Sequence, residues 1–339
     1  MKVTERVPVG DKSQVAEARR LTATMGRVLG FDEALVAQAS IVATELAANL
    51  LSHAGGGEML LRSFQRGAAS GVEVIALDKG PGIEHVGQAL RDGYSTSGSP
   101  GTGLGAVQRL SSVFDLYSRP GKGTAVLSQL WQKRPSDFVP PPHPLEMGMV
   151  CVPVTTEEAC GDTWAVHQSR ERTLIMVADG LGHGEHAAQA SVVAAKVFEE
   201  DLDSTPAQMI ERMHVALRAT RGAAVAVAEL LWSQHLVRYA GVGNISGRMV
   251  SGEVIHGMVS HNGTVGLEAR KIQELSYPWP DDGLIILHSD GLASQWNLED
   301  YPGLRARHAA LISGVLFRDH NRIRDDSVVV VLRKARISR

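Results

Sequence analysis

The stretch Asp179-Gly180-Leu181-Gly182-His183-Gly184-Glu185-His186 lies near the middle of the 339-residue chain and guides the interpretation of the rest. The apolar, partly β-branched segment 173–178 before it predicts a buried strand. That strand delivers Asp179 onto a glycine-rich turn, and a helix of small residues is expected over 187–199. A carboxylate at a strand end, followed by glycines that admit backbone carbonyls, suits a hard cation such as Mg²⁺ or Mn²⁺. Alone the pattern is weak, because Asp-Gly is also a common turn dipeptide.

Other acidic residues occur in similar settings later and earlier in the same half of the chain. Asp162 precedes an apolar stretch, Asp290 follows the predicted strand 284–287, and Asp325 and Asp326 open the predicted strand 327–332. One acid at a strand end is more often a turn former than a ligand. Four such places in one segment favour a metal site. Two adjacent cations that share a bridging carboxylate activate water for phosphoester hydrolysis.

The order of these motifs resembles the metal-dependent (PPM) serine/threonine protein phosphatases, in the branch of SpoIIE and RsbX, over about residues 145–333. The segments 220–223 and 239–244 add to the likeness. The resemblance implies two Mn²⁺ or Mg²⁺ ions bridged by Asp179, one of them touched by the Gly180 carbonyl. It implies that Asp290 and Asp325 hold the other ion and that Asp162 acts mainly through metal-bound water. Asp326 stands where many relatives have Asn, so its role beside Asp325 stays open.

His183 has two interpretations. Since histidine titrates near neutrality, it could be the acid that protonates the leaving Ser or Thr oxygen. A structural or solvent-exposed histidine is equally compatible with the sequence. His186 and His288 are interpreted as structural.

The first part of the chain carries a different set of motifs. Glu45 and Asn49 are four residues apart in an apolar segment predicted to be helical, so they share one face, as an exposed polar stripe or as a pair facing a ligand. Asp78-x-Gly80-x-Gly82 ends the predicted strand 72–77. The carboxylate could accept from the exocyclic amine of a purine, and the glycines would admit the ring closely.

A second glycine-rich run, 101–105, opens a predicted helix over 106–112. Backbone N–H groups at a helix start suit a phosphate. A Rossmann interpretation fails, because no strand directly precedes the glycines and no βαβ unit surrounds them. Strands at 113–117 and 124–127, joined by a Pro-Gly-Lys-Gly turn, predict a hairpin.

These motifs together resemble the GHKL ATPases, and among them the anti-sigma-factor serine kinases, over about residues 5–131. The resemblance implies that Asn49 holds the Mg²⁺ of Mg-ATP and that Glu45 is the base or orienter for a substrate hydroxyl. A histidine-kinase interpretation is poor, because no dimerisation helix pair with a phosphoacceptor histidine is visible. The implied nucleotide contacts are Asp78, which reads adenine, with Gly80, Gly82, Gly101, Thr102, Gly103, Leu104, Gly105 and Thr124.

The expected fold class is α/β in two domains, separated by a Pro-rich, semi-rigid linker at 134–146. Residues 1–133 are expected to form a GHKL-type two-layer α/β sandwich, a mixed sheet with helices on one face. Residues 147–339 are expected to form a PPM-type four-layer α/β/β/α sandwich. Further expected elements are a strand at 248–256 and helices at 206–220 and 305–316.

Composition narrows the class of protein. Hydrophobic residues make up 44% of the chain and charged residues 21%, and the formal net charge of −3 gives no electrostatic case for nucleic-acid binding. The two cysteines, Cys151 and Cys160, are too few for a disulfide framework. No apolar signal region and no run of transmembrane length are visible, so a soluble cytoplasmic protein without membrane association is expected.

The sequence thus predicts a bifunctional bacterial signalling enzyme. One half would be an ATP-binding kinase-like domain, and the other a Mn²⁺/Mg²⁺-dependent phosphatase acting on Ser or Thr of a protein. The resemblance implies a phosphorylated STAS-type (anti-anti-sigma-type) partner in a pathway that controls a sigma factor or another regulator. An alternative is that the first domain is an ATP-gated adaptor that sequesters a partner or regulates the phosphatase without phosphotransfer. A small-molecule phosphatase is a third interpretation, since metal-binding acids do not define a substrate.

Overall fold

The computed structural model describes residues 3–66, 69–91, 103–132, 145–252 and 254–335, and its contacts divide the chain into two units. The N-terminal unit contains Lys2–Pro140 together with Tyr301–Arg318, and the C-terminal unit contains Pro141–Asp300 and Asp319–Arg339. The segment 301–318 therefore groups with the first unit, although it follows most of the second in sequence. The predicted phosphate contacts Gly101 and Thr102, and most of the predicted linker, lie outside the described residues.

A five-stranded sheet in the order β1-β2-β3-β5-β4 forms the base of the N-terminal unit. All four neighbouring pairs are antiparallel, so the prediction of a mixed sheet is wrong in that detail. The physical reason is that β2–β3 and β4–β5 are hairpins and β3 and β5 also run in opposite directions. The strands are β1 (Glu5–Val9), β2 (Gly57–Arg66), β3 (Ala69–Leu77), β4 (Val113–Arg119) and β5 (Gly123–Trp131).

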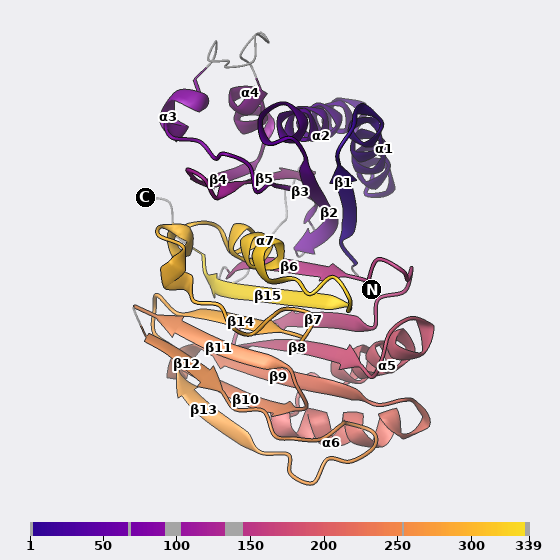
Figure 1. The fold of residues 1–339 in the computed structure, drawn as a ribbon. Coiled ribbons are helices and arrows are strands. Elements are labelled where there is room, and N and C mark those ends of the chain that lie inside the picture. The colour runs from indigo at the N-terminus through magenta and orange to yellow at the C-terminus, as the bar shows by residue number, and fades with distance from the viewer. Residues whose placement is uncertain (1–2, 67–68, 92–102, 133–144, 253, 336–339) are drawn as a thin grey trace. The chain divides into compact units, whose positions relative to one another are not determined.

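Helices α1 (Lys12–Val28), α2 (Glu33–Ala54) and α4 (Gly103–Leu110) lie on one face of this sheet, with the short α3 (Val86–Ala89) beyond them (Figure 1). Aspartates cap the first two: Asp11 forms a capping box with Gln14, and Asp32 accepts from the backbone N–H of Leu35. By length and hydropathy α2 is the one helix in the described residues that could span a membrane. Seven of its residues are buried in the protein core, which is the pattern of a core helix.

The opposite face of the same sheet meets helix α7 (Ala309–His320) (Figure 1). Alternation along β3 turns Val74 toward the core under α1 and α2, and Ile75 and Leu77 toward the other face. A Cβ added at Gly314 of α7 would lie 3.2 Å from Ile75 and 3.4 Å from Leu77. The glycine thus allows a close approach of helix and sheet.

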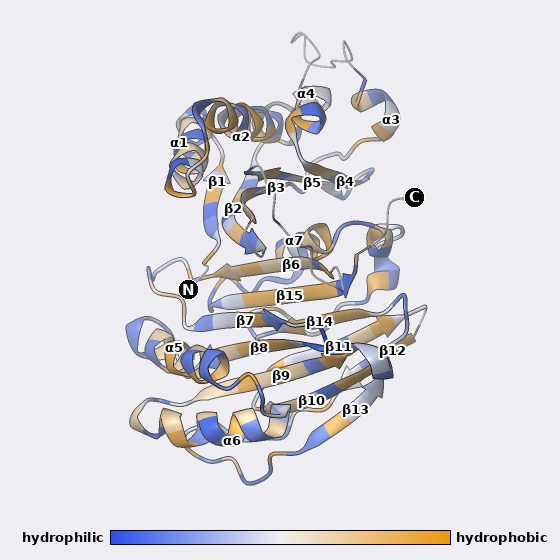
Figure 2. Ribbon diagram, turned by 180° about the vertical axis from the view of Figure 1, so that it is seen from behind, coloured by the Kyte–Doolittle hydropathy of each residue, from blue (hydrophilic) through white to orange (hydrophobic). Residues whose placement is uncertain are grey.

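Two five-stranded antiparallel sheets make up the C-terminal unit, in the orders β13-β10-β9-β8-β7 and β12-β11-β14-β15-β6. Helices α5 (Glu185–Glu200) and α6 (Pro206–Ala216) cover the first sheet (Figure 1). The central strands are hydrophobic along most of their length, as buried strands require (Figure 2). The strands are β6 (Leu145–Val152), β7 (Asp162–Gln168), β8 (Arg172–Gly180), β9 (Ala223–Leu231), β10 (Leu236–Val242), β11 (Ser246–Ser251), β12 (Val254–Met258), β13 (Glu274–Pro278), β14 (Leu284–His288) and β15 (Ser327–Lys334).

Most predicted elements of both units are confirmed, and the exceptions are local. The segment 248–256 was predicted as one strand but forms parts of β11 and β12, which pair with each other as a hairpin. Strand β6 begins at Leu145, inside the predicted linker, and β13 was not predicted. The two cysteines are buried thiols that do not form a disulfide with each other.

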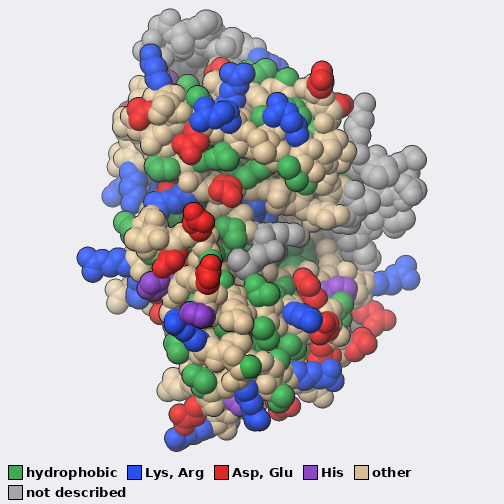
Figure 3. Space-filling model, turned by 90° about the vertical axis from the view of Figure 1, so that its right-hand side faces the viewer, with side chains coloured by type: hydrophobic (Ala, Val, Ile, Leu, Met, Phe, Trp, Pro, Cys, Tyr) green, Lys and Arg blue, Asp and Glu red, His purple; other side chains and the backbone are tan. Residues whose placement is uncertain are grey.

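On the face of the molecule drawn in Figure 3, Lys and Arg side chains are interspersed with Asp and Glu. This mixture agrees with the small net charge of the sequence.

Candidate functional site

The predicted metal-binding acids gather at one end of the C-terminal unit. Asp162 on β7 lies directly opposite Asp179 on β8 in the antiparallel register. A cavity of about 520 Å³ is lined by Asp179, Asp290 and Asp325, and His183 also lines it. The acids predicted from four separate stretches of sequence therefore meet in one region.

Burial and mutual repulsion make this region attractive to cations. Burial raises the pKa of Asp179 to about 7, and the charges of Asp290, Asp325 and Asp326 contribute. Burial, with the Asp290 charge next in size, also raises the pKa of Asp325. A carboxylate with a raised pKa gains from a bound cation, because the positive charge offsets both desolvation and repulsion between neighbours.

Gly180 is required by its close packing rather than by its backbone dihedrals. A Cβ at Gly180 would lie 2.1 Å from the carbonyl oxygen of Ala187, so no other residue fits here without a backbone shift. Gly182 and Gly184, in the turn between β8 and α5, have φ values of 89° and 74°. Those left-handed conformations favour glycine and bring the chain from the strand into the helix within a few residues.

Asp162 is buried and is not among the residues that line the cavity. The Ser289 hydroxyl donates to its Oδ2 at 2.5 Å. Burial raises the pKa of Asp162 well above its usual value, the Asp179 charge adds to the shift, and the Ser289 bond opposes it. Asp162 is therefore held next to Asp179 on the neighbouring strand and bonded to Ser289, which is compatible with action through water.

The structure gives Asp326 a role that the sequence left open. Its Oδ1 accepts from the Val154 N–H at 2.7 Å and its Oδ2 from the Gly161 N–H at 2.8 Å. The side chain is buried. Asp326 thus ties β15 to the backbone just before Asp162, whereas Asp325 lines the cavity.

Substitution of the two adjacent aspartates should separate stability from activity. Asp326→Ala leaves two buried backbone N–H groups without their acceptor, so we expect a loss of about 2–4 kcal/mol in unfolding free energy. Asp325→Ala should keep the wild-type unfolding midpoint but lose metal-dependent phosphatase activity. Urea unfolding and phosphate release on the two variants test this, and equal destabilisation by both would contradict the assignment.

Other polar side chains surround the cavity. His183 Nδ1 lies 2.9 Å from Glu157 Oε1, and the imidazole is exposed. His288 is buried between the Ser289 carbonyl and the indole N–H of Trp296, which agrees with a structural role. Asn244 donates to Asp290 Oδ2 at 2.7 Å. The sequence signal for Asn244 was its place in the motif 239–244, but it was not singled out as a site residue.

The donor set fits divalent cations that prefer oxygen. The cavity presents three carboxylates with Gly180 and Asp162 beside them. Within the described residues no three acidic, histidine or cysteine side chains already converge on one metal position. In Mg²⁺-type sites one or two carboxylates bind each ion and water completes the shell.

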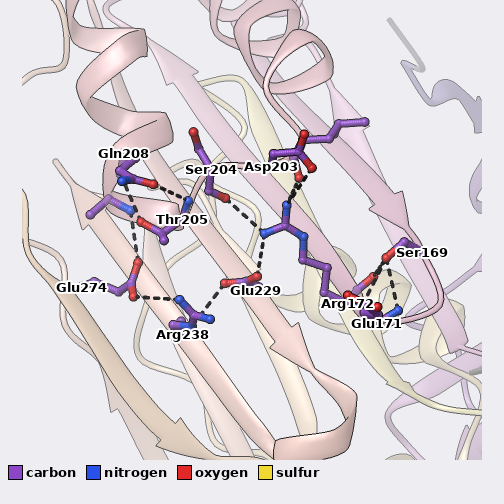
Figure 4. Close-up of polar contacts among 12 residues, drawn as sticks. Ser169, Glu171, Arg172, Asp203, Ser204, Thr205, Gln208, Glu229, Arg238 and Glu274 are labelled. Carbon is purple, nitrogen blue, oxygen red and sulfur yellow. Dashed lines mark hydrogen bonds and ion pairs between the residues drawn. The ribbon is translucent and has the colours of Figure 1, made fainter.

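A second cavity, of about 380 Å³, lies at the other end of β8 and β9 (Figure 4). The buried Glu229 pairs there with Arg172 at 2.9 Å and with Arg238 at 3.3 Å. Arg172 also donates to the Leu202 and Ser204 carbonyls of the α5–α6 connection. These charges are paired with one another, so the cluster anchors that connection to the sheet.

The predicted nucleotide residues of the N-terminal unit also come together. Glu45 and Asn49 lie one turn apart on α2. A Cβ added to Gly103, at the start of α4, would lie 3.3 Å from Glu45 Oε2 and 3.5 Å from Asn49 Oδ1. The start of α4, where free N–H groups suit a phosphate, is therefore next to the predicted Mg²⁺ ligand and base.

The loop after β3 holds the Asp78 carboxylate in a defined orientation. Asp78 Oδ1 accepts from the backbone N–H groups of Gly80 at 2.8 Å and Thr124 at 3.1 Å. Burial raises the pKa of Asp78, and these two N–H donors act in the opposite direction. Glycine is needed at Gly82, where φ is 74° and a Cβ would lie 2.1 Å from the Arg119 carbonyl oxygen.

Of the remaining predicted contacts, Leu104 packs against the hydrophobic core and Gly105 is buried within α4. Both therefore support the helix whose start lies beside Glu45 and Asn49.

Comparison with known families divides the chain in the same way. Residues 9–129 match the histidine kinase-like ATPase domain, and residues 169–334 match stage II sporulation protein E, SpoIIE. The chain is 35% identical to the serine/threonine-protein kinase RsbT of Bacillus subtilis over 117 residues, which are 34% of this chain and 88% of RsbT.

The second half is similar to a phosphatase of the same organism. It is 26% identical to the phosphoserine phosphatase RsbX over 137 residues, 39% of this chain and 67% of RsbX. A crystal structure of RsbX with magnesium superposes with a TM-score of 0.50 at 21% identity, covering 60% of this chain and 99% of that one, which shows the shared fold. A structure from the bacterial stressosome, a system adapted to control secondary messenger signalling, has a TM-score of 0.53 at 27% identity, covering 56% of this chain and 99% of that one.

Proposed function

Since the chain belongs to the RsbT-like family of histidine kinase-type ATPase domains in its first half and to the SpoIIE phosphatase family in its second, we propose that it adds and removes phosphate on one regulatory protein. The observation that carries the phosphatase part is the cavity of about 520 Å³ lined by Asp179, Asp290 and Asp325. Residues 1–133 would bind ATP, residues 134–146 would be the linker, and residues 147–339 would be the phosphatase.

In the phosphatase half, each acidic residue would have a different role in metal binding. Two Mn²⁺ or Mg²⁺ ions, when bound, supply Lewis acidity and a water of lowered pKa. Asp179 would hold both ions, the Gly180 carbonyl would bind one of them, and Asp290 and Asp325 would hold the other. Asn244 orients Asp290 through its 2.7 Å bond, and Asp162, opposite Asp179 on the neighbouring strand, would act through water. His183, at the cavity wall beside Glu157, would give a proton to the leaving Ser or Thr oxygen.

In the kinase-like half, Asn49 would hold the Mg²⁺ of Mg-ATP, and Asp78 would accept from the adenine amine. Both of its backbone donors use Oδ1, so Oδ2 is the oxygen that would face adenine. Glu45, close to the start of α4, would take the proton of a substrate hydroxyl near the terminal phosphate.

The proposed substrate is a STAS-type protein carrying a phosphorylated Ser or Thr, in a cytoplasmic pathway that controls a sigma factor or another regulator. The support is the pairing of two domain types whose relatives are a protein kinase and a phosphoserine phosphatase. No membrane or nucleic acid is part of the proposal.

Glu45→Gln tests whether the first half transfers phosphate or only binds ATP. We expect the variant to bind Mg-ATP as the wild type does, because the amide keeps the shape and the Mg²⁺ ligand Asn49 is unchanged. Transfer of labelled phosphate from ATP to a STAS protein should fall at least about 100-fold, the usual contribution of a general base.

Gln38→Glu, which adds an acid to the same helix two turns before Glu45, is the matched control and should transfer phosphate normally. Unchanged transfer by Glu45→Gln would contradict the catalytic role. No transfer by the wild type, with Mg-ATP bound, would favour the ATP-gated adaptor.

A further inference from the structure

Helix α7 carries residues of both units in one continuous element. Residues up to Arg318 group with the N-terminal unit, and those from Asp319 onward group with the C-terminal unit. Within the N-terminal unit, α7 packs on the sheet face opposite α1, α2 and α4 (Figure 1). The kinase-like sheet is therefore covered on its second face by residues that follow most of the phosphatase half in sequence.

Polar contacts hold α7 to the N-terminal unit at both ends. Near its start, Asp115 of β4 accepts from the His308 N–H at 2.7 Å and from Arg307 Nη1 at 3.2 Å. Near its end, Arg318 Nη1 donates to the backbone carbonyl oxygen of Asp78 at 2.9 Å. One helix thus connects the outer strand of the sheet with the loop proposed to read adenine.

The backbone around the Asp78 carbonyl is closely packed, so a small displacement there would change the orientation of the Asp78 side chain. A Cβ on Gly123 would lie 2.0 Å from this oxygen, so the β5 backbone passes against it. The Asp78 side chain accepts from Gly80 and Thr124 on either side of the same contact. A shift of the Asp78 backbone would therefore turn the carboxylate away from its ligand.

We propose that Arg318 is a positioning residue of the nucleotide site, and that α7 links nucleotide binding to the metal-binding segment that follows it. This inference rests on the proposed binding of ATP by the first half of the chain. Arg318 itself does not touch the nucleotide in this assignment; it fixes the backbone from which Asp78 reaches the adenine amine.

The chain after Arg318 leads directly to the predicted metal ligands. The His320 carbonyl accepts from the Ala293 N–H at 2.9 Å, and the Arg322 N–H donates to the Gly291 carbonyl at 2.8 Å. These bonds tie the segment to the turn that carries Asp290, and Asp325 follows three residues after Arg322. Ordering of the nucleotide loop would thus restrain, through seven residues of chain, the segment that carries the proposed metal ligand Asp325.

The experiment compares Arg318→Ala with Arg307→Ala in the full-length protein, at one fixed Mg²⁺ concentration. Arg307 is the matched control, because it is an arginine bonded to Asp115 at the other end of α7. Calorimetry measures the affinity for ADP and GDP. Hydrogen exchange with mass spectrometry follows residues 319–328 with and without ADP.

We expect Arg318→Ala to bind ADP about tenfold more weakly and to lose part of its preference for ADP over GDP, because Asp78 is no longer held. Arg318→Lys, which keeps a donor, should recover part of that preference. ADP should slow exchange over 319–328 in the wild type and in Arg307→Ala, and have no effect there in Arg318→Ala.

Each alternative result removes a defined part of the proposal. Wild-type ADP affinity and selectivity in Arg318→Ala would overturn the positioning role and leave ATP binding intact. Equal weakening in Arg307→Ala would mean that α7 acts only as structural support. If the wild type binds ADP and hydrogen exchange over 319–328 does not change, the proposed link between nucleotide binding and the metal-binding segment is overturned. Absence of nucleotide binding by the wild type would overturn both this inference and the proposed kinase-like function.

Discussion

Replacement of Asp179 by Asn is expected to lower the Mn²⁺-dependent phosphatase rate at least about 1000-fold while the fold is retained. Asp179 is the residue proposed to hold both ions, and loss of such a carboxylate removes several kcal/mol of transition-state stabilisation. Each 1.36 kcal/mol corresponds to a factor of ten. The amide is nearly isosteric, and burial already raises the pKa of Asp179 to about 7, so a neutral side chain is tolerated there without metal. Phosphate release from a phosphoserine protein, titrated with Mn²⁺, measures the effect.

Asp203→Asn is the matched control, because it removes the same charge from an exposed position in the same unit. It should keep the wild-type rate and metal dependence. If Asp179→Asn in the presence of EDTA is as active as the wild type with Mn²⁺, the two-ion site is ruled out. A lower unfolding midpoint for Asp179→Asn than for Asp203→Asn would show that the loss of rate came from misfolding.

Asn49→Ala is expected to weaken binding of Mg-ATP about 100-fold and to change the affinity for metal-free ATP much less. The side chain lies beside Glu45 and the start of α4, where it would complete the coordination of the nucleotide's Mg²⁺. Because Asn49 would bind the Mg²⁺ ion and not the nucleotide itself, its removal should weaken the binding of Mg-ATP and not that of metal-free ATP. Calorimetry on the full-length chain, with Mg²⁺ and with EDTA, measures the ratio of the two affinities.

Gln38→Ala removes an amide from the same helix, eleven residues and so about 16 Å away, and should leave both affinities unchanged. If Asn49→Ala binds Mg-ATP as tightly as the wild type, the Mg²⁺-ligand assignment is wrong. If both affinities fall together, Asn49 supports the pocket rather than the metal.

The features predicted most accurately from the sequence are those that depend on residues close together in the chain. Asp32 caps α2 because its side chain reaches the backbone three residues on, and the hairpin of β4 and β5 follows from its turn residues. Strand direction across the N-terminal sheet depends on pairing between distant segments, and there the prediction of a mixed sheet was wrong. The break between β11 and β12 was missed because Ser251-Gly252, a turn signal between two short apolar runs, was included in one predicted strand.

In the candidate sites, too, local patterns were predicted and contacts between distant residues were not. Spacing on a helix predicted that Glu45 and Asn49 share a face, and strand ends predicted where Asp179 and Asp290 would lie. The role of Asp326 could not be predicted, because the backbone N–H groups that donate to it, those of Val154 and Gly161, are distant in sequence. The contact between Arg318 and Asp78 joins residues 240 positions apart, and no local pattern marks it.

The discontinuous N-terminal unit has a consequence for the time course of biosynthesis. Its two segments, ending at Pro140 and resuming at Tyr301, are separated by 160 intervening residues, from 141 to 300. At roughly 5–20 residues per second, a ribosome needs about 8–32 s to synthesise them. During that interval the sheet face that carries Ile75 and Leu77 has no helix to cover it. The emerging kinase-like half is therefore expected to be a chaperone client until α7 has left the exit tunnel, although it is synthesised first.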